Sequence, residues 1–380
     1  RFIHNMKKKH IMTPKYSDVE WVERMFDKSN SYTTKANAET SLRVFDHFAK
    51  QQIGLNGESK DTLISQYQEM FAQEKPDIQG ICISLDKFVR FMSKSHDEIA
   101  VGNGSTFKAK APKTMRNYFG FIKNYLRICH GIRLTNEDVQ DFVQFPTQRK
   151  QLREPVSLEN LKMICNRASP TRRALYLILI SSGMRLGEGL SLKKSNFHLD
   201  ESPVRVTLRA DDTKTKEERE TYISSEALER LQPILDSNGD DEYLFHNSKR
   251  IDFAVRTEVR EFGYLRSRLG LTKRYDSSVR FLVHIHAFRA YFHTKASQKH
   301  GSDYANALDG HGAYLKQYYR EDPKERAQKY LELQSELFIE WKQLETEKTK
   351  DKLMDNMKTQ MDKMQTEIER LLKFNQATTV

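Results

Sequence analysis

The chain has 380 residues and a formal net charge of +11, with a sequence pI near 9.3. This length allows two domains with separate hydrophobic cores, and the positive balance favours an anionic partner. No apolar run is long enough to cross a bilayer, and residues 1–12 lack the apolar segment of a secretory signal. We therefore expect an intracellular protein and exclude the secreted and membrane-spanning classes. Three widely spaced cysteines in apolar surroundings predict reduced core thiols, without a disulfide or metal framework: Cys82, Cys129 and Cys165.

The first part of the sequence predicts a helical domain. Residues 1–16 are basic and unpatterned, which is typical of a loose leader. From residue 17 to residue 145, apolar residues recur every three or four positions, the spacing of one helix face. Pro112 suits a first helical turn, and Thr135 with Asp138 predicts a capped helix that runs to Phe145. No strand pattern is visible, so we expect a domain made of helices alone.

A polar linker at residues 146–155, bracketed by prolines, separates this domain from a second one at residues 156–335. Residues 174–180 are apolar on every face, which predicts a buried helix that stops at a Ser-Gly pair. Residues 204–208 alternate like a strand, and residues 221–223 fit its return partner across a polar loop. The expected fold class is therefore mainly α with a small β-hairpin (α+β).

The last segment, residues 336–380, has the spacing of a heptad helix. Such a helix suits a coiled coil, but it also suits docking onto its own domain, and the sequence leaves both readings open. Methionine packs adaptably at these positions and specifies the number of strands poorly. The apolar positions of this seam are Met354, Met357, Met361, Met364, Ile368 and Leu371.

The second domain contains the side chains that phosphodiester chemistry without a metal ion requires. Arginine can bind two phosphate oxygens through its planar fork, lysine or histidine can protonate a leaving oxygen, and tyrosine can attack the phosphorus. Each residue type is common on protein surfaces by itself, so the argument depends on the whole set and its order. The candidate residues are Arg185, Lys214, His286, Arg289, His311 and Tyr319.

Several of these candidates lie in recognisable motifs. The segment 182–188 reads Ser-Gly-Met-Arg-Leu-Gly-Glu, residues 286–289 form a His-x-x-Arg box, and residues 308–311 read Leu-Asp-Gly-His. With Lys214 in the hairpin loop between the first two motifs, the second domain resembles the catalytic domain of tyrosine recombinases. These include the phage-type integrases and their archaeal relatives, and the resemblance covers about residues 157–330. It implies a helical core-binding domain before the linker.

The resemblance also implies roles for these residues. Tyr319 attacks the scissile phosphate and forms a 3′-phosphotyrosyl bond, while Arg185 and Arg289 hold the non-bridging oxygens. Lys214 protonates the 5′ leaving oxygen. His286 acts as an acid/base or hydrogen-bond partner in proton transfer. No metal or other cofactor takes part.

Three further assignments follow from the same motifs. His311 is expected to donate a hydrogen bond to the phosphate, and Glu188 is expected to orient Arg185. Tyr319 lies eight residues after His311, one fewer than is typical of the family. The neighbouring Tyr318 therefore remains an alternative nucleophile.

Together these features predict a site-specific DNA recombinase, or integrase, encoded by a mobile element. Its expected partners are double-stranded DNA, clamped between the two domains, and further copies of itself in a tetramer. We expect it to act in the cytoplasm, in association with the nucleoid, or to come from a virion or a mobile element. Two alternatives remain: a type IB topoisomerase that relaxes one duplex, and a non-catalytic DNA-binding protein that dimerises through its heptad helix.

Overall fold

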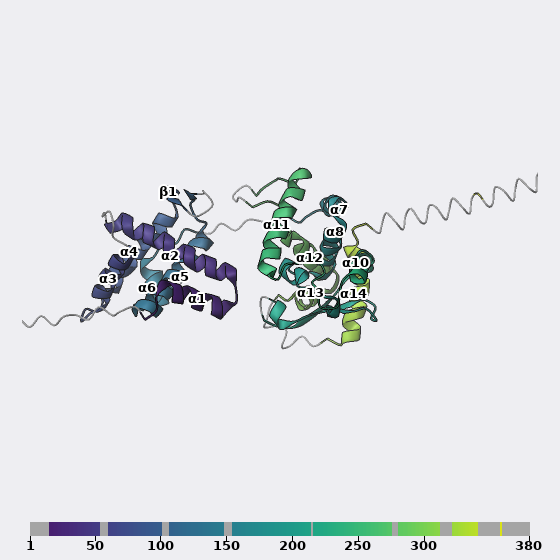
Figure 1. Cartoon of the computed structure of the whole chain (residues 1–380), viewed down its shortest axis with the longest axis horizontal. Helices are drawn as coiled ribbons and strands as arrows, with labels where there is room; N and C mark the ends of the chain where they lie inside the picture. Colours follow the sequence, from purple (N-terminus) through teal and green to yellow (C-terminus); the bar gives the residue numbers. More distant parts are fainter. Residues whose placement is uncertain are drawn as a thin grey trace, which may run out of the picture. The chain divides into compact units, whose positions relative to one another are not determined.

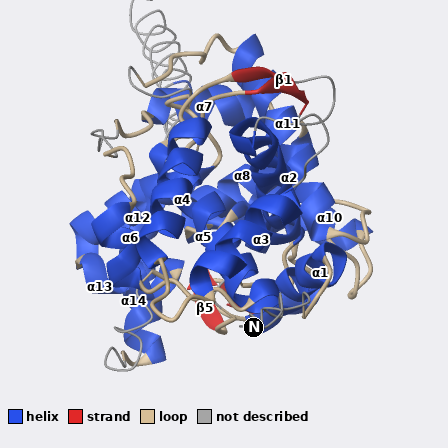
Figure 2. Cartoon of the chain, turned by 90° about the vertical axis from the view of Figure 1, so that its left-hand side faces the viewer, coloured by secondary structure: helices blue, strands red, loops and turns tan. Residues whose placement is uncertain are grey.

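The computed structural model of the chain describes residues 15–53, 60–100, 106–147, 154–213, 216–275, 280–311, 321–340 and 358. The chain divides into two compact units, residues 1–150 and 151–380, and the division falls within the segment expected as a linker. Helices dominate both units, and the strands are short (Figure 2). The expected fold class, mainly helical with a small sheet, is confirmed. The leader up to residue 14 and nearly all of the heptad segment lie outside the described residues.

The first unit is built on a core of aromatic and aliphatic side chains. Trp21, Phe45, Phe88 and Ile122 are fully buried within it. The predicted capping box of Thr135 and Asp138 is present at the start of α6 (Asn136–Phe142). The helix ends at Phe142, however, and not at Phe145 as expected. The helices are α1 (Asp18–Ser29), α2 (Tyr32–Ile53), α3 (Lys60–Phe71), α4 (Ile78–Met92), α5 (Pro112–His130) and α6 (Asn136–Phe142) (Figure 1).

The expectation of a purely helical first domain is wrong, because this unit also contains two strands. β1 (His96–Ala100) pairs antiparallel with β2 (Thr106–Phe107), with an irregular register between the two matched pairs. Phe107 is fully buried and anchors the pair to the core. A two-residue strand is too short to display an alternating pattern in the sequence, so periodicity did not reveal it.

The second unit is organised around α8 (Pro170–Ser182) and α12 (His286–His300), which pack against each other (Figure 1). All residues of α8 from Ala174 to Ser182 are buried, which confirms the predicted central helix and its end at Gly183. Around this pair lie α7 (Leu158–Arg167), α9 (Leu186–Leu190), α10 (Ser225–Ser237), α11 (Ile251–Arg268), α13 (Ser302–Asp309) and α14 (Pro323–Leu337).

A three-stranded antiparallel sheet completes this unit. β4 (Arg205–Leu208) pairs with β5 (Arg219–Tyr222), as the alternating pattern predicted, and with β3 (Phe197–His198) on its other edge. β3 was not anticipated, again because it has only two residues. β5 packs on α8 and α13, so the sheet reaches the helices that carry the motif residues.

The segment that follows α14 is held against α10 by hydrogen bonds to a buried carboxylate. The carboxylate of Glu226, 2% exposed, accepts backbone hydrogen bonds from Ile339 at 2.8 Å and Glu340 at 2.5 Å. Glu340 in turn accepts from Arg173 at 2.7 Å and from Arg230 at 3.4 Å. Two buried carboxylates thus receive charged or backbone donors, as burial of a carboxylate requires.

Two further expectations concern the cysteines and membrane insertion. The three cysteines are free and buried, as predicted. Among the described residues, no helix combines the length and apolar character that a membrane span needs.

Candidate active site

Arg185 stands where the central helix stops and a short helix starts. Gly183 ends α8 in the left-handed conformation, with φ of 67°, and Arg185 is the extended residue before α9. Its backbone N–H donates to Oε2 of Glu188 at 2.7 Å, and its Nη1 donates to Oε1 at 2.9 Å. One carboxylate therefore fixes both the backbone and the side chain of Arg185, whose side chain is 26% exposed.

Glu188 connects this arginine to a second one from the sheet. Its side chain is 2% exposed, and Oε2 also accepts from Nη2 of Arg219 on β5 at 2.7 Å. Burial lowers the pKa of Arg219, while the charge of Glu188 acts in the opposite direction. Glu188 thus lies between two guanidinium groups, which supports the expectation that it orients Arg185.

Arg289 on α12 is almost completely buried, with 2% of its side chain exposed. Its Nη1 donates to the carbonyl of Gly183 at 2.6 Å, which links α12 to the turn that precedes Arg185. Burial lowers the pKa of Arg289 to about 10, and the positive charges of Arg185 and Arg219 act in the same direction. The guanidinium nevertheless remains protonated at neutral pH, beside Asp309.

His311 follows the glycine that terminates α13. Gly310 adopts φ of 76°, and a Cβ atom there would lie 2.8 Å from Nε of Arg219, so no larger residue fits. This turn directs the chain so that the backbone N–H of His311 donates to Oδ1 of Asp309 at 2.9 Å. The His311 side chain is 52% exposed.

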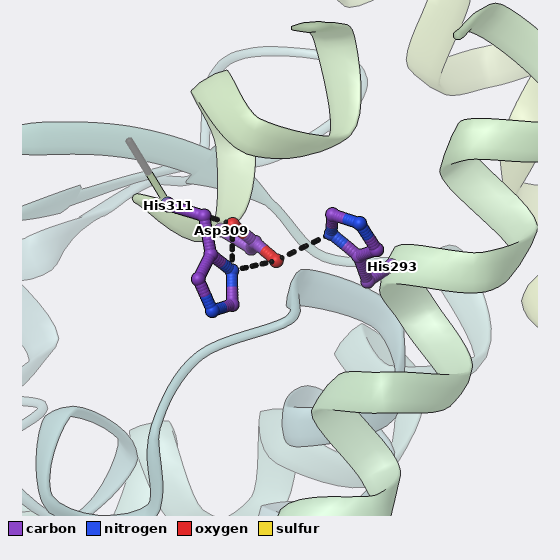
Figure 3. A group of neighbouring side chains, drawn as sticks. All are labelled: His293, Asp309 and His311. Atoms are coloured by element: carbon purple, nitrogen blue, oxygen red, sulfur yellow. Dashed lines mark hydrogen bonds and ion pairs between the residues drawn. The ribbon is translucent and has the colours of Figure 1, made fainter. Parts of the chain in front are cut away.

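Asp309 is the buried acceptor shared by two histidines (Figure 3). Its carboxylate, which has no exposed surface, lies 2.9 Å from Nδ1 of His311 and 2.9 Å from Nδ1 of His293. Nη2 of Arg289 lies 3.1 Å from the same His311 nitrogen, but one nitrogen cannot both donate to the carboxylate and accept from the guanidinium. We assign the proton of His311 Nδ1 to the hydrogen bond with the Asp309 carboxylate, because a buried anion needs every donor within reach.

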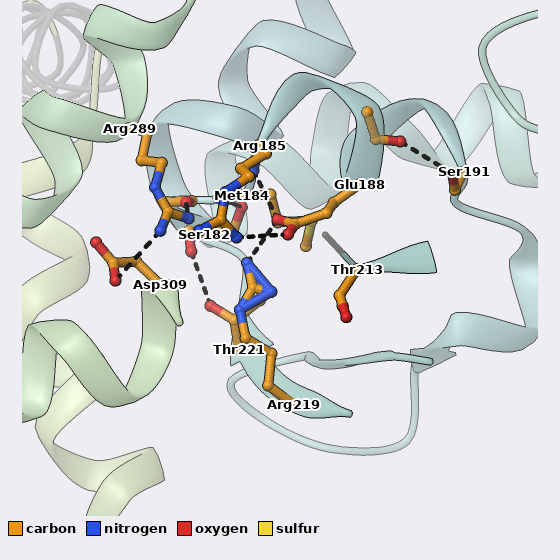
Figure 4. A network of polar contacts seen from close by, with 12 residues as sticks. Ser182, Met184, Arg185, Glu188, Ser191, Thr213, Arg219, Thr221, Arg289 and Asp309 are labelled. Carbon is orange, nitrogen blue, oxygen red and sulfur yellow. Dashed lines mark hydrogen bonds and ion pairs between the residues drawn. The ribbon is translucent and has the colours of Figure 1, made fainter. Parts of the chain in front are cut away.

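These contacts form one polar cluster of three guanidinium groups and two carboxylates (Figure 4). The cluster keeps one uncompensated positive charge before its histidines are counted. Arg185 and His311 are its partly exposed members, whereas Arg289 and Arg219 are buried. Such an arrangement can bind an anion at the two exposed side chains while the buried arginines supply a fixed positive field.

Among the described residues, one group has ligand atoms close enough to hold a metal ion: His293, Asp309 and His311, within 4.8 Å of one another. Arg289 Nη2 lies 3.1 Å from His311 Nδ1 and 3.5 Å from Asp309 Oδ1. A divalent cation would therefore sit against a guanidinium group and would be repelled by it. Protons shared with the carboxylate fit this geometry better than a metal does.

The structure brings together four of the predicted site residues: Arg185, Glu188, Arg289 and His311. His286 is the exposed first residue of α12, three residues before Arg289, and its ring centroid lies 6.3 Å from that of His284. Three other predicted residues lie outside the described part of the chain: Lys214, Tyr318 and Tyr319.

Three members of the cluster were not anticipated as site residues: Arg219, Asp309 and His293. His293 belongs to none of the sequence motifs, yet its Nδ1 contacts Asp309. A signal was available, because His293 lies four residues after Arg289 and shares its helix face. Arg219 offered only its position after the hairpin loop, and Asp309 only its place before the Gly-His pair.

The part of the chain that carries this cluster is similar to proteins of a known family. Residues 133–313 match the profile of the phage integrase family. This segment, slightly less than half of the chain, is therefore similar to the family that the motifs indicate. The match begins before the expected residue 157 and ends before Tyr318 and Tyr319.

Relatives support the same family. The chain is 28% identical over 199 residues to a probable integrase/recombinase protein of Methanocaldococcus jannaschii, covering 46% of this chain and 58% of that protein. It is 25% identical over 181 residues to a probable integrase/recombinase of Acholeplasma phage L2, covering 45% of this chain and 57% of that protein. The alignments thus span less than two thirds of either relative.

Two solved structures can be set beside the chain. XerH site-specific recombinase bound to difH substrate aligns at 16% identity and a TM-score of 0.46, over 82% of this chain and 83% of that one. A lambda integrase dimer bound to a COC′ core site aligns at 13% identity and a TM-score of 0.42, over 80% and 97%.

Proposed function

We propose that this chain is a site-specific DNA recombinase that breaks and rejoins duplex DNA through a 3′-phosphotyrosyl intermediate. The observation that carries the proposal is the convergence of Arg185, Arg289 and His311, from three separate segments, on two buried carboxylates. Two of these side chains are partly exposed and one is a buried charge, which suits a single phosphate group. Energy conserved in the phosphotyrosyl bond would allow rejoining without a nucleotide cofactor.

The cluster suggests how the work is divided. Arg185, held from behind by Glu188, contacts a non-bridging oxygen of the phosphate. Arg289 stabilises the charge that develops there, from a position fixed by the Gly183 carbonyl. His311 donates a further hydrogen bond to the phosphate.

The chemical steps themselves involve residues outside the described part of the chain. Tyr319 attacks the phosphorus, its O–P bond forms as the bond to the 5′ oxygen breaks, and Lys214 gives a proton to that oxygen. Rejoining reverses these steps, with the 5′-hydroxyl as the nucleophile. His286 takes part in proton transfer or hydrogen bonding, and exchange between two duplexes takes place within a tetramer.

One exposed helix face supports a duplex-DNA partner. Phe253 and Tyr264 on α11 are 57% and 59% exposed, and Arg256 and Arg260 lie between them at helical spacing, with side chains 67% and 63% exposed. Aromatic and basic side chains on one face are typical of nucleic-acid surfaces. Asp252 pairs with Arg256 at 2.7 Å and would release it to a phosphate.

The proposal can be tested by covalent capture. The full chain is incubated with a pool of duplexes that carry a nick at a fixed position and random sequence around it, and SDS-stable adducts are isolated and sequenced. We expect an adduct with a shared sequence, whose mapped peptide contains the attached tyrosine. The absence of any adduct, while the pool is still bound, would reduce the protein to a DNA-binding role.

Two matched variants assign the nucleophile. Tyr319→Phe should abolish the adduct but preserve DNA binding, and Tyr318→Phe should leave the adduct in place. The opposite result moves the nucleophile to Tyr318. Relaxation of a supercoiled plasmid without strand exchange between two recovered sites would instead identify a topoisomerase.

The role of Lys214 has its own test. Lys214→Ala should slow cleavage strongly on ordinary DNA, because an alkoxide is a poor leaving group. Replacing the bridging 5′ oxygen by sulfur should restore the rate, since a thiol with a pKa of about 8.5 leaves without a proton donor. A variant that stays slow on the sulfur substrate would exclude Lys214 as the acid.

A further inference from the structure

We propose that Asp309 is a positioning residue of this active site, which fixes the orientation and tautomer of His311, while His293 holds the same carboxylate through its other oxygen. The proposal deepens the recombinase function proposed above and rests on it for the catalytic measurement. The structural measurement needs no DNA and is therefore independent of the recombinase function.

The geometry around Asp309 is that of a carboxylate saturated with donors. The backbone N–H of His311 lies 2.9 Å from Oδ1, and the His311 ring nitrogen Nδ1 lies 2.9 Å from each oxygen. Nδ1 of His293 lies 2.9 Å from Oδ2, and Arg289 Nη2 lies 3.5 Å from Oδ1. The carboxylate itself has no exposed surface, so it cannot turn to water when one donor is lost.

This arrangement determines which nitrogen of His311 can serve the substrate. A backbone and a ring donor on the same carboxylate hold the imidazole with Nδ1 turned inward, so that Nε2 points away from the carboxylate (Figure 3). With a proton on Nδ1 directed at the carboxylate, Nε2 is left to the substrate: it accepts a hydrogen bond or a proton in the neutral ring and donates to a phosphate oxygen when the ring is doubly protonated. Without Asp309, nothing would hold the proton on Nδ1 or keep the ring from rotating, so Nε2 would no longer be presented to the substrate in one orientation and one protonation pattern.

His293 is the second support of the carboxylate. It lies four residues after Arg289 on α12, so the helix that carries the buried arginine also carries the donor to Oδ2. The ring is partly exposed, at 35%, and it contacts the His311 ring edge-on with centroids 5.6 Å apart. His293 therefore restricts the movement of both Asp309 and His311.

The structural test is nitrogen NMR on the full chain with ¹⁵N-labelled histidine, with His311 assigned by loss of its signals in His311→Gln. In the unaltered protein we expect His311 to carry a proton on Nδ1. In Asp309→Asn we expect a signal that shifts toward the form protonated on Nε2 alone. A His311 ring protonated only on Nε2 in the unaltered protein, or one unchanged in Asp309→Asn, would overturn the proposal.

The catalytic test compares cleavage with binding on the duplex recovered from the nicked pool. Asp309→Asn should slow adduct formation by about 100-fold, in the range of a positioned proton or hydrogen-bond donor, while DNA affinity stays within about twofold. Equal losses of rate and affinity would indicate a merely structural role and contradict the proposal.

Because Asp309 is fully buried, a second pair of variants protects the test against misfolding. His293→Asn keeps an N–H donor near the place of Nδ1, whereas His293→Phe keeps a ring and removes the donor. We expect near-normal cleavage from His293→Asn and slow cleavage from His293→Phe. Equal rates for the two variants would refute the role of His293. If the unaltered chain forms no adduct with any duplex, the recombinase function fails, and the NMR result alone decides the role of Asp309.

Discussion

Gly183 offers a direct test of how the site is held together, because it ends α8, precedes Arg185 and binds Arg289 through its carbonyl. In Gly183→Ala, the new Cβ would lie 2.3 Å from Cδ1 of Phe292, which is fully buried and cannot move away. Such overpacking costs about 1–3 kcal/mol. The left-handed conformation, with φ of 67°, adds about 1–2 kcal/mol for a residue with a side chain. We expect a total loss of about 2–5 kcal/mol.

The matched control is Gly270→Ala. Gly270 has nearly the same conformation, with φ of 69°, but no atom lies within 4 Å of the place that a Cβ would take, so only the backbone cost applies. Differential scanning calorimetry of the full chain should show a melting temperature for the second unit lowered by roughly 4–20 °C in Gly183→Ala. In Gly270→Ala the decrease should be only roughly 2–8 °C. Equal shifts in the two variants would show that contact with Phe292 contributes nothing and would refute the packing argument.

Four further predictions concern other features. Glu188→Gln should destabilise the second unit by about 3 kcal/mol in urea unfolding, because two arginines lose the charge between them; an unchanged midpoint would contradict this. Arg256→Ala combined with Arg260→Ala should weaken DNA binding and reduce the slope of log affinity against log salt by about 2, and an unchanged slope would exclude this face. Thr135→Ala should cost about 1 kcal/mol, since its hydroxyl caps α6, and calorimetry of the first unit measures it. Burial raises the pKa of the thiols of Cys82, Cys129 and Cys165. A thiol reagent at neutral pH should therefore label none of them in the folded chain and all of them in urea, and rapid labelling of the folded chain would contradict this.

Local patterns predicted those parts of the fold that depend on neighbouring residues. The apolar run of α8, its glycine stop and the hairpin of β4 and β5 all depend on periods or turns that the sequence displays directly. The pair β1–β2 does not, since a strand as short as Thr106–Phe107 is defined by its partner rather than by its own pattern.

The candidate site divides in the same way. Arg185 and Glu188 are three residues apart, and a capped helix start brings them together without help from elsewhere. The partner of Glu188, Arg219, lies 31 residues away on the sheet, and His293 lies 16 residues from Asp309. Contacts at such separations arise from tertiary packing: helical spacing places His293 on the face of Arg289, but it does not show that Asp309 lies opposite that face.

The contacts of Glu226 and Glu340, which hold the segment after α14, limit how far the second unit can be shortened from its C-terminal side. A chain that ended at Leu337 would lack both amides that bind Glu226, and it would also leave Arg173 and Arg230 without the Glu340 carboxylate. The buried acid would then lack its backbone donors, and the two partly exposed arginines would lack their shared partner. The second unit therefore needs the chain at least as far as residue 340, beyond the end of α14.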